Sequence, residues 1–224
     1  MTFQDAPRRT LADQVYEALE RDILSGKYRD GELLSENRIS QETGASRTPV
    51  REALRRLETE GLTQTLPNRG VAVRPVTAAD ARDIYEIRMR VEGLAARRAA
   101  SSAGSEDVRV LFEVAELQEF YASRSNAEQL KILDTQFHEE IYRLCGSEYL
   151  MQMLRDMHRR IQRFRKLSMQ EPGRISVIPK EHRSIAEAIR DGDPDRAERL
   201  MIAHIHAAAE NLTNIIDANE SEER

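Results

Sequence analysis

Residues 46–62, with the sequence SRTPVREALRRLETEGL, carry the strongest local signal in the chain. Ser46 is a favoured N-cap, and Pro49 suits the first turn of a helix, where its missing amide hydrogen costs nothing. Gly61 stands where glycine commonly ends a helix. Apolar side chains recur at helical spacing along one stripe, and four arginines lie mostly off it, at positions 47, 51, 55 and 56. The segment is therefore predicted to be a helix with one packed face and one cationic face.

The residues before this helix predict two more helices. Apolar residues recur at helical spacing from Leu11 to Ile23, and Gly26 ends that helix. Ser35 is placed to cap a shorter helix that ends near Gly44. The short helix, a tight turn with glycine and the arginine-bearing helix match the helix-turn-helix pattern, whose second helix enters the major groove of DNA.

Two brief β-prone runs follow, at residues 62–66 and 71–73. The residues between them, Pro67-Asn68-Arg69-Gly70, are those that hairpin turns favour, so the two runs are predicted to pair. Residues 1–74 are therefore predicted to form a winged helix-turn-helix DNA-binding domain. Arg69, at the tip of the wing, is placed to reach an adjacent minor groove or a phosphate.

The rest of the chain has helical periodicity and no strand pattern. Residues 75–77 are predicted to be an extended linker, because Pro75 disfavours helix at the residue before it. Thr77 and Asp80 have the form of a capping box that opens a long helix ending near residue 100. Further helices are predicted at residues 105–123, 127–144, 148–168, 179–190 and 194–217. The fold class is thus mainly α, with an all-helical bundle at 78–218 and a disordered tail at 219–224.

Charge and cysteine content narrow the partners and the compartment. The net charge of −5 argues against binding nucleic acid over the whole surface, although basic and acidic residues balance within 1–74. Cys145 is the only cysteine, which fits a reducing cytoplasm. No apolar run approaches a membrane span, and the first residues lack a signal-peptide core. We expect a soluble cytoplasmic protein without a membrane partner.

The placement of the histidines suggests a metal site. Asp134 and His138 lie four residues apart and share one face of a predicted helix. His182 begins the next-to-last helix, and His204 lies within the last one. Three imidazoles and a carboxylate suit a divalent ion such as Zn, Ni, Mn or Fe. By spacing alone, the Asp134–His138 pair is a weak signal for a metal, and its ordinary interpretation is a surface salt link or a hydrogen-bonded core histidine. The other two histidines, His158 and His206, are interpreted as structural.

Arg88 and Glu92 form another pair four residues apart, on the helix that opens the second domain. The ordinary interpretation is a salt bridge, which is weak if exposed. A functional interpretation is that Arg88 faces inward and binds an organic carboxylate beside the metal.

With these residues in view, the chain resembles GntR-family transcription regulators of the FadR-like subfamily. The resemblance rests on GASRTPVREALRRLETEGL followed by NRGVAV, at residues 44–73. It implies base and phosphate contacts by Ser46, Arg47, Thr48 and Arg51, with Gly70 at the wing. Some relatives have arginine at the position of Asn37; Arg38 is the candidate substitute here, although it faces another direction.

The second half resembles the ligand-binding FCD domain through EIRMRVEGLAA, DTQFHEEIYRLCG, EHRSIAEAIRDGD and the helix around residue 204. Many FCD domains bind a metal through one Asp and three His, which match Asp134, His138, His182 and His204. The resemblance further implies dimerisation through this domain, and a carboxylate metabolite as effector at or near the metal.

We therefore expect a homodimeric, sequence-specific regulator, a repressor of a palindromic operator, that responds to a small organic acid or sugar acid. It is not expected to be an enzyme. The main alternative is a metal-dependent hydrolase or other metalloenzyme using the Asp/His site. No general-base or nucleophile motif supports that alternative, which also leaves the 46–62 helix without a purpose. A helical scaffold, with a merely structural Asp134–His138 pair, is the third interpretation.

Overall fold

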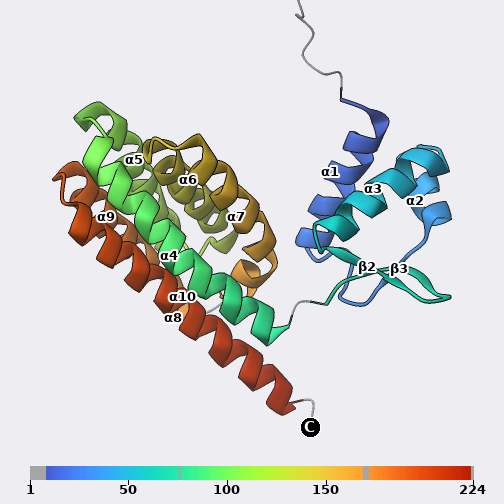
Figure 1. The fold of residues 1–224 in the computed structure, drawn as a ribbon. Coiled ribbons are helices and arrows are strands. Elements are labelled where there is room, and N and C mark those ends of the chain that lie inside the picture. The colour runs from blue at the N-terminus through green and yellow to red at the C-terminus, as the bar shows by residue number, and fades with distance from the viewer. Residues whose placement is uncertain (1–8, 76, 169–171, 223–224) are drawn as a thin grey trace, which may run out of the picture. The chain divides into compact units, whose positions relative to one another are not determined.

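The computed structural model describes residues 9–75, 77–168 and 172–222. The chain divides into two compact units, with the boundary between residues 76 and 77 (Figure 1). This division falls within the predicted linker 75–77. Val76 and residues 223–224 of the predicted tail lie outside the described residues. None of the helices in the described ranges is long and apolar enough to cross a bilayer.

The first unit contains three helices and a small antiparallel sheet. The helices are α1 (Leu11–Leu24), α2 (Glu36–Thr43) and α3 (Arg47–Thr59). The strands are β1 (Leu33–Leu34), β2 (Thr63–Leu66) and β3 (Gly70–Val73), in the order β1-β3-β2. The winged helix-turn-helix prediction is confirmed. Strand β1 was missed, because two residues are too few to show an alternating pattern.

Capping and a shared core position the arginine-bearing helix. Thr10 and Asp13 form a reciprocal capping box at the start of α1, and Ser35 caps α2 through the Arg38 amide. Gly44 ends α2 with φ +69°, a conformation that costs glycine little and lets α3 start almost at once. The buried apolar faces of the three helices pack on one another through Val15, Leu19, Ile23, Ile39, Val50, Leu54 and Leu57.

The wing is the β2–β3 hairpin. Leu66 pairs with Gly70 across a three-residue loop, in which Asn68 has φ +60°. Gly70 itself has φ +89°, so the turn residues predicted from sequence supply the left-handed conformations that the hairpin needs. On the other side of β3, Leu33 of β1 pairs with Ala72.

The second unit is all helical, as predicted. Its helices are α4 (Ala78–Ser102), α5 (Ser105–Ala122), α6 (Ala127–Leu144), α7 (Glu148–Ser168), α8 (Pro172–Ile175), α9 (Ile178–Arg190) and α10 (Pro194–Glu222). The short helix α8 was not predicted. The disordered tail was predicted to begin at residue 219, whereas α10 continues to Glu222.

Helices α4 and α10 pack along each other (Figure 1). Gly93 lies in the middle of α4, and a Cβ atom at this position would come within 2.9 Å of Ile202 Cγ1 on α10. Glycine in a helix interior costs roughly 1 kcal/mol relative to alanine. Close approach of the two helices explains why this position has no side chain.

Candidate metal centre and nucleic-acid interface

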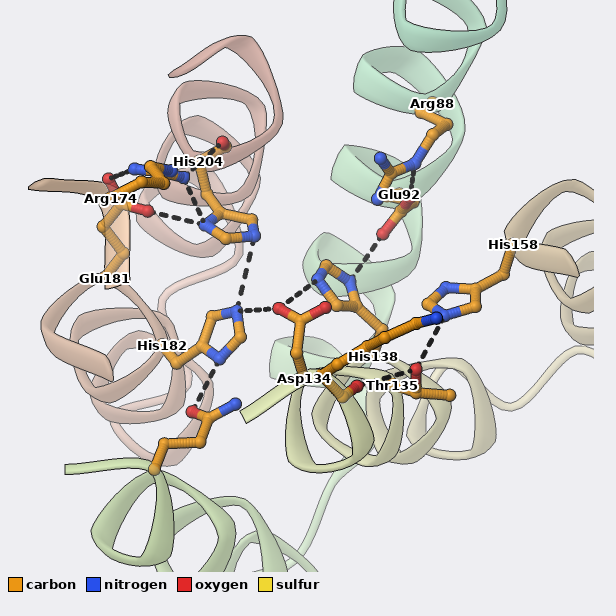
Figure 2. A network of polar contacts seen from close by, with 12 residues as sticks. Arg88, Glu92, Asp134, Thr135, His138, His158, Arg174, Glu181, His182 and His204 are labelled. Atoms are coloured by element: carbon orange, nitrogen blue, oxygen red, sulfur yellow. Dashed lines mark hydrogen bonds and ion pairs between the residues drawn. The ribbon is translucent and has the colours of Figure 1, made fainter. Parts of the chain in front are cut away.

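The histidines and the aspartate predicted as metal ligands come together inside the second unit. Asp134 and His138 extend from α6, His182 from α9 and His204 from α10, and all four are buried. The potential ligand atoms lie within 4.8 Å of one another (Figure 2). The Asp134 Oδ1 atom is 3.6 Å from His182 Nε2 and 4.0 Å from His138 Nε2. Ligand atoms about 2 Å from a shared ion lie roughly 3 to 4 Å apart, so these separations suit a metal.

Each of the three histidines has an oxygen acceptor beside its other ring nitrogen, Nδ1. Such partners fix the tautomer of a metal-binding imidazole and aim its lone pair. The pairs are His138 Nδ1 with Glu92 Oε2 at 2.7 Å, His182 Nδ1 with Gln118 Oε1 at 2.8 Å and His204 Nδ1 with Glu181 Oε2 at 2.7 Å. With hydrogen on Nδ1, the Nε2 lone pairs of all three rings face the same point.

Two observations show that this donor set fits a divalent ion. Both ring nitrogens of His138 are fully buried and make no hydrogen bond among the described residues, although Nδ1 lies 2.7 Å from Glu92 Oε2. The Nε2 atoms of His182 and His204 are only 3.3 Å apart. Two lone pairs facing each other in a dry interior are unfavourable, and a shared cation removes that conflict. Three imidazole nitrogens and one carboxylate would hold the metal.

A buried ion pair lies beside the cluster. The Arg88 guanidinium donates from Nε to Glu92 Oε1 at 2.5 Å, and both side chains are about 2% exposed or less. Burial by itself favours the neutral acid, but Arg88 and His138 hold the pKa of Glu92 well below its usual range. Within the described residues, the two terminal nitrogens of Arg88 donate no hydrogen bond. Arg88 thus forms the salt bridge of the first interpretation and also faces inward, as the second requires.

The remaining histidines lie outside the cluster. His158 is buried, with Nδ1 3.4 Å from the Tyr142 hydroxyl and Nε2 3.3 Å from the Thr135 hydroxyl. Burial, with smaller electrostatic contributions from the neighbouring His138 and Arg88, lowers the pKa of His158 to about 3, so this ring is neutral. His206 is exposed, and its Nδ1 atom lies 3.4 Å from Glu210 Oε2.

The sequence interpretation missed the residues that orient the histidines. Glu92 was noted only as the partner of Arg88, and Gln118 and Glu181 were not noted. Glu181 directly precedes His182, so the acidic neighbour was visible in EHRSIAEAI, but its contact with His204 on another helix was not. Arg174, on the unpredicted α8, contacts both Glu181 and His204.

In the first unit, the predicted DNA-contacting residues divide into two groups. Ser46 is the N-cap of α3, but its side chain makes no capping hydrogen bond, and Ser46, Arg47 and Thr48 are exposed. The start of α3 therefore keeps amide donors for an anion such as a phosphate. At the wing, Arg69 and Gly70 are also exposed.

The other two arginines are held by carboxylates. Arg51 forms two hydrogen bonds with Glu36 of α2, at 3.0 and 2.9 Å. Arg38 bonds to Glu42 at 2.9 Å and to Glu32 at 3.1 Å. These ion pairs link α2 to its surroundings and account for local charge balance in the domain.

Comparison with known proteins agrees with this geometry. Residues 83–207 match the FCD domain, and residues 11–73 match the bacterial regulatory proteins of the gntR family. The chain is 29% identical over 206 residues to the HTH-type transcriptional regulator YdhC of Bacillus subtilis (strain 168), covering 91% of this chain and 92% of that protein. It is 28% identical over 213 residues to the HTH-type transcriptional repressor RspR of Escherichia coli (strain K12), covering 95% and 93%.

A third relative, the Nta operon transcriptional regulator of Aminobacter aminovorans, is 32% identical over 193 residues, covering 86% of this chain and 90% of that protein. Among solved structures, E. coli McbR/YncC has the same fold, with a TM-score of 0.73 at 21% identity, covering 96% of this chain and 99% of that chain. These relatives are transcriptional regulators and not enzymes, which removes the metalloenzyme alternative. The chain belongs to the GntR family of DNA-binding transcriptional regulators, in the FadR-like subfamily whose second domain is an FCD domain.

Proposed function

We propose that this protein is a homodimeric repressor that binds a palindromic operator, and that a small organic acid at or near a divalent metal in residues 78–218 controls its DNA affinity. The convergence of three oriented imidazoles and Asp134 on one buried point carries the proposal. The relative RspR is a transcriptional repressor, which supports the direction of control. A location in the cytoplasm, beside the chromosome, is part of the proposal.

The DNA contacts are assigned to the start of α3 and to the wing. Arg47 is exposed there, and Ser46 and Thr48 stand beside the free amides of the first turn. Arg51 would exchange Glu36 for a base or phosphate, and Arg69 and Gly70 would approach the backbone or minor groove. A good bidentate base contact is worth about 1 to 3 kcal/mol of discrimination. Arg38, tied to two carboxylates, is the weakest of the assigned contacts.

The effector site is assigned to the neighbourhood of the metal and Arg88, which Glu92 connects. A guanidinium buried next to the centre, with two terminal nitrogens free of hydrogen bonds in the described structure, suits a carboxylate. The candidate metals are Zn, Ni, Mn and Fe. A bound ion of this kind would have further coordination positions for a carboxylate or hydroxyl oxygen of the effector. The effector changes DNA affinity only by as much as it prefers one arrangement of the protein over the other.

A thermal-shift screen of organic acids and sugar acids, with and without chelator, tests this function. An effector is expected to raise the unfolding midpoint only when metal is present, because it binds the folded protein at the metal. The same compound should release the wild-type protein from operator DNA, and should fail to do so with Arg88→Gln. Full release from DNA by a compound acting on metal-free protein would contradict the proposal.

A further inference from the structure

His204 differs from the other two histidines of the cluster in what surrounds its Nδ1 atom. Glu181 Oε2 lies 2.7 Å from this nitrogen, and the Nη2 atom of Arg174 lies 3.3 Å from it (Figure 2). A carboxylate accepts a hydrogen bond and a guanidinium only donates one. Nδ1 therefore donates a hydrogen bond to Glu181 when it carries the hydrogen, and accepts one from Arg174 when it does not.

The choice between these two partners decides which nitrogen is available to a metal. His204 Nε2 is the atom that faces the cluster, 3.3 Å from His182 Nε2. When the hydrogen is on Nδ1, Nε2 has a lone pair for the metal. When Arg174 donates to Nδ1, the neutral ring must carry its hydrogen on Nε2, which then points into the cluster and blocks coordination.

The positions of the two partners favour the metal-binding tautomer as long as Glu181 is present. Glu181 makes the shorter contact with Nδ1, and its other oxygen accepts from Arg174 Nη1 at 2.6 Å. Arg174 Nη2 also donates to the His204 carbonyl oxygen at 3.1 Å. The guanidinium is thus occupied by Glu181 and the backbone, and its side chain is only 9% exposed, so it stays beside the ring.

The other two candidate ligands have different partners at Nδ1. His182 Nδ1 contacts the neutral amide of Gln118. His138 Nδ1 contacts Glu92, and the Arg88 that pairs with Glu92 makes no hydrogen bond to the ring. At His204, an acceptor and a fixed cationic donor compete for one nitrogen.

We propose that Glu181 is a positioning residue that holds His204 in its metal-binding tautomer, and that Arg174 enforces the blocking tautomer whenever Glu181 is removed. The inference rests on the proposed metal site. Helix α8 then contributes to the control of metal binding, because it carries Arg174.

Competition with a chelator of known affinity tests the proposal by measuring zinc dissociation constants. Glu181→Ala should weaken zinc binding by about tenfold or more, the range found for residues that orient metal ligands. Arg174→Ala should weaken it less. The double variant Glu181→Ala with Arg174→Ala should bind zinc more tightly than Glu181→Ala alone, because the competing donor is gone. A purely structural role for the pair predicts the reverse order for the double variant, which would overturn the proposal.

A control pair and a metal-free readout separate this inference from the metal site itself. Arg109 and Glu113 form an exposed ion pair on α5, and replacing both with alanine should leave zinc affinity unchanged.

In metal-free protein, nitrogen NMR should find the His204 hydrogen on Nδ1 in the wild type and on Nε2 in Glu181→Ala. Wild-type protein that binds no zinc but shows this tautomer change would contradict the metal site alone. The same tautomer in both proteins would overturn the inference.

If Glu181→Ala fails to fold, the other two variants decide. His204 should keep its hydrogen on Nδ1 in Arg174→Ala, where Glu181 still accepts it, and should lose that preference in the double variant. An Nε2 hydrogen in Arg174→Ala would overturn the proposal.

Discussion

At the scale of single residues, function in both units depends on which hydrogen-bonding partners a side chain already has. Arg47 is exposed at the start of α3, whereas Arg51 is bound to Glu36. In the second unit, the Nδ1 atoms of His182 and His204 already have oxygen partners, so Nε2 is the ring nitrogen left for a metal.

Arg47→Ala should weaken operator binding by tenfold or more, because it removes an exposed guanidinium from the first turn of α3. The helix itself should be unaffected, since Arg47 is not part of its buried face. Arg55→Ala, an exposed arginine two turns further along α3, is the matched control and should change binding much less. Footprinting and binding isotherms at fixed salt measure both, and unchanged footprints for Arg47→Ala would contradict the assignment.

The buried neutral His158 predicts a pH dependence of stability. Its pKa is lowered to about 3 in the folded protein, whereas an unfolded histidine titrates near 6.5. The unfolded chain therefore takes up a proton that the folded protein does not, and folding loses about 1.4 kcal/mol for each pH unit between about 6.5 and 3. Denaturant unfolding with chelator present should show that His158→Gln loses about 2 kcal/mol less than wild type between pH 7 and pH 5. Equal losses would show that His158 already carries a proton in the folded state.

At the scale of helices and strands, close packing positions residues that are far apart in sequence. Helix α6 carries two candidate ligands one turn apart, and the others come from α9 and α10. All three helices pack against α4, which brings these residues together. The contact between α4 and α10 depends on Gly93, which lies against Ile202. Glu92, the neighbour of Gly93, orients His138.

Gly93→Leu should destabilise the second unit by roughly 1 to 3 kcal/mol, because a side chain at this position forces α4 and α10 apart. Zinc affinity should fall as well, since Glu92 moves with α4. The double variant Gly93→Leu with Ile202→Ala should recover part of both losses. Stability is measured by denaturant unfolding, and a fully stable Gly93→Leu would rule out close packing at this contact.

At the scale of the whole molecule, the protein consists of a winged helix-turn-helix unit and an FCD unit, divided between residues 76 and 77. The four candidate metal ligands and the residues beside them all belong to the second unit. Metal binding is therefore expected to stabilise residues 77–224 directly and the winged unit only through its connection to them.

Removal of metal should lower the unfolding midpoint of the second unit. A metal ion present at 100 times its dissociation constant stabilises the folded state by about 2.7 kcal/mol, and a chelator removes this stabilisation. Calorimetry of wild type with and without chelator should show the difference, and metal analysis should find about one ion per chain. His138→Ala should contain no metal and should not respond to chelator. A chelator effect of the same size in His138→Ala would place the metal elsewhere.

Local sequence signals determined the elements and the family. Ser35, Gly44 and Gly61 mark helix ends through backbone preferences that act within a few residues, and the wing turn depends on Asn68 and Gly70 in the same way. The motif at residues 44–73 predicted the DNA-binding unit, and the resemblance of the second half to FCD domains predicted Asp134, His138, His182 and His204 as candidate metal ligands. The very short elements β1 and α8 were not predicted, because segments of two and four residues are too short to show a hydrophobic periodicity.

Only the tertiary structure decided how the ligands are oriented and which arginines are engaged. Gln118 and Glu181 act on histidines of other helices, and Glu36 binds an arginine fifteen positions away. Such pairings depend on burial and on distances between helices, which no local pattern encodes. Sequence alone thus predicted which residues form the candidate metal centre. Packing decided that each imidazole presents Nε2, because the acceptors for Nδ1 come from neighbouring helices.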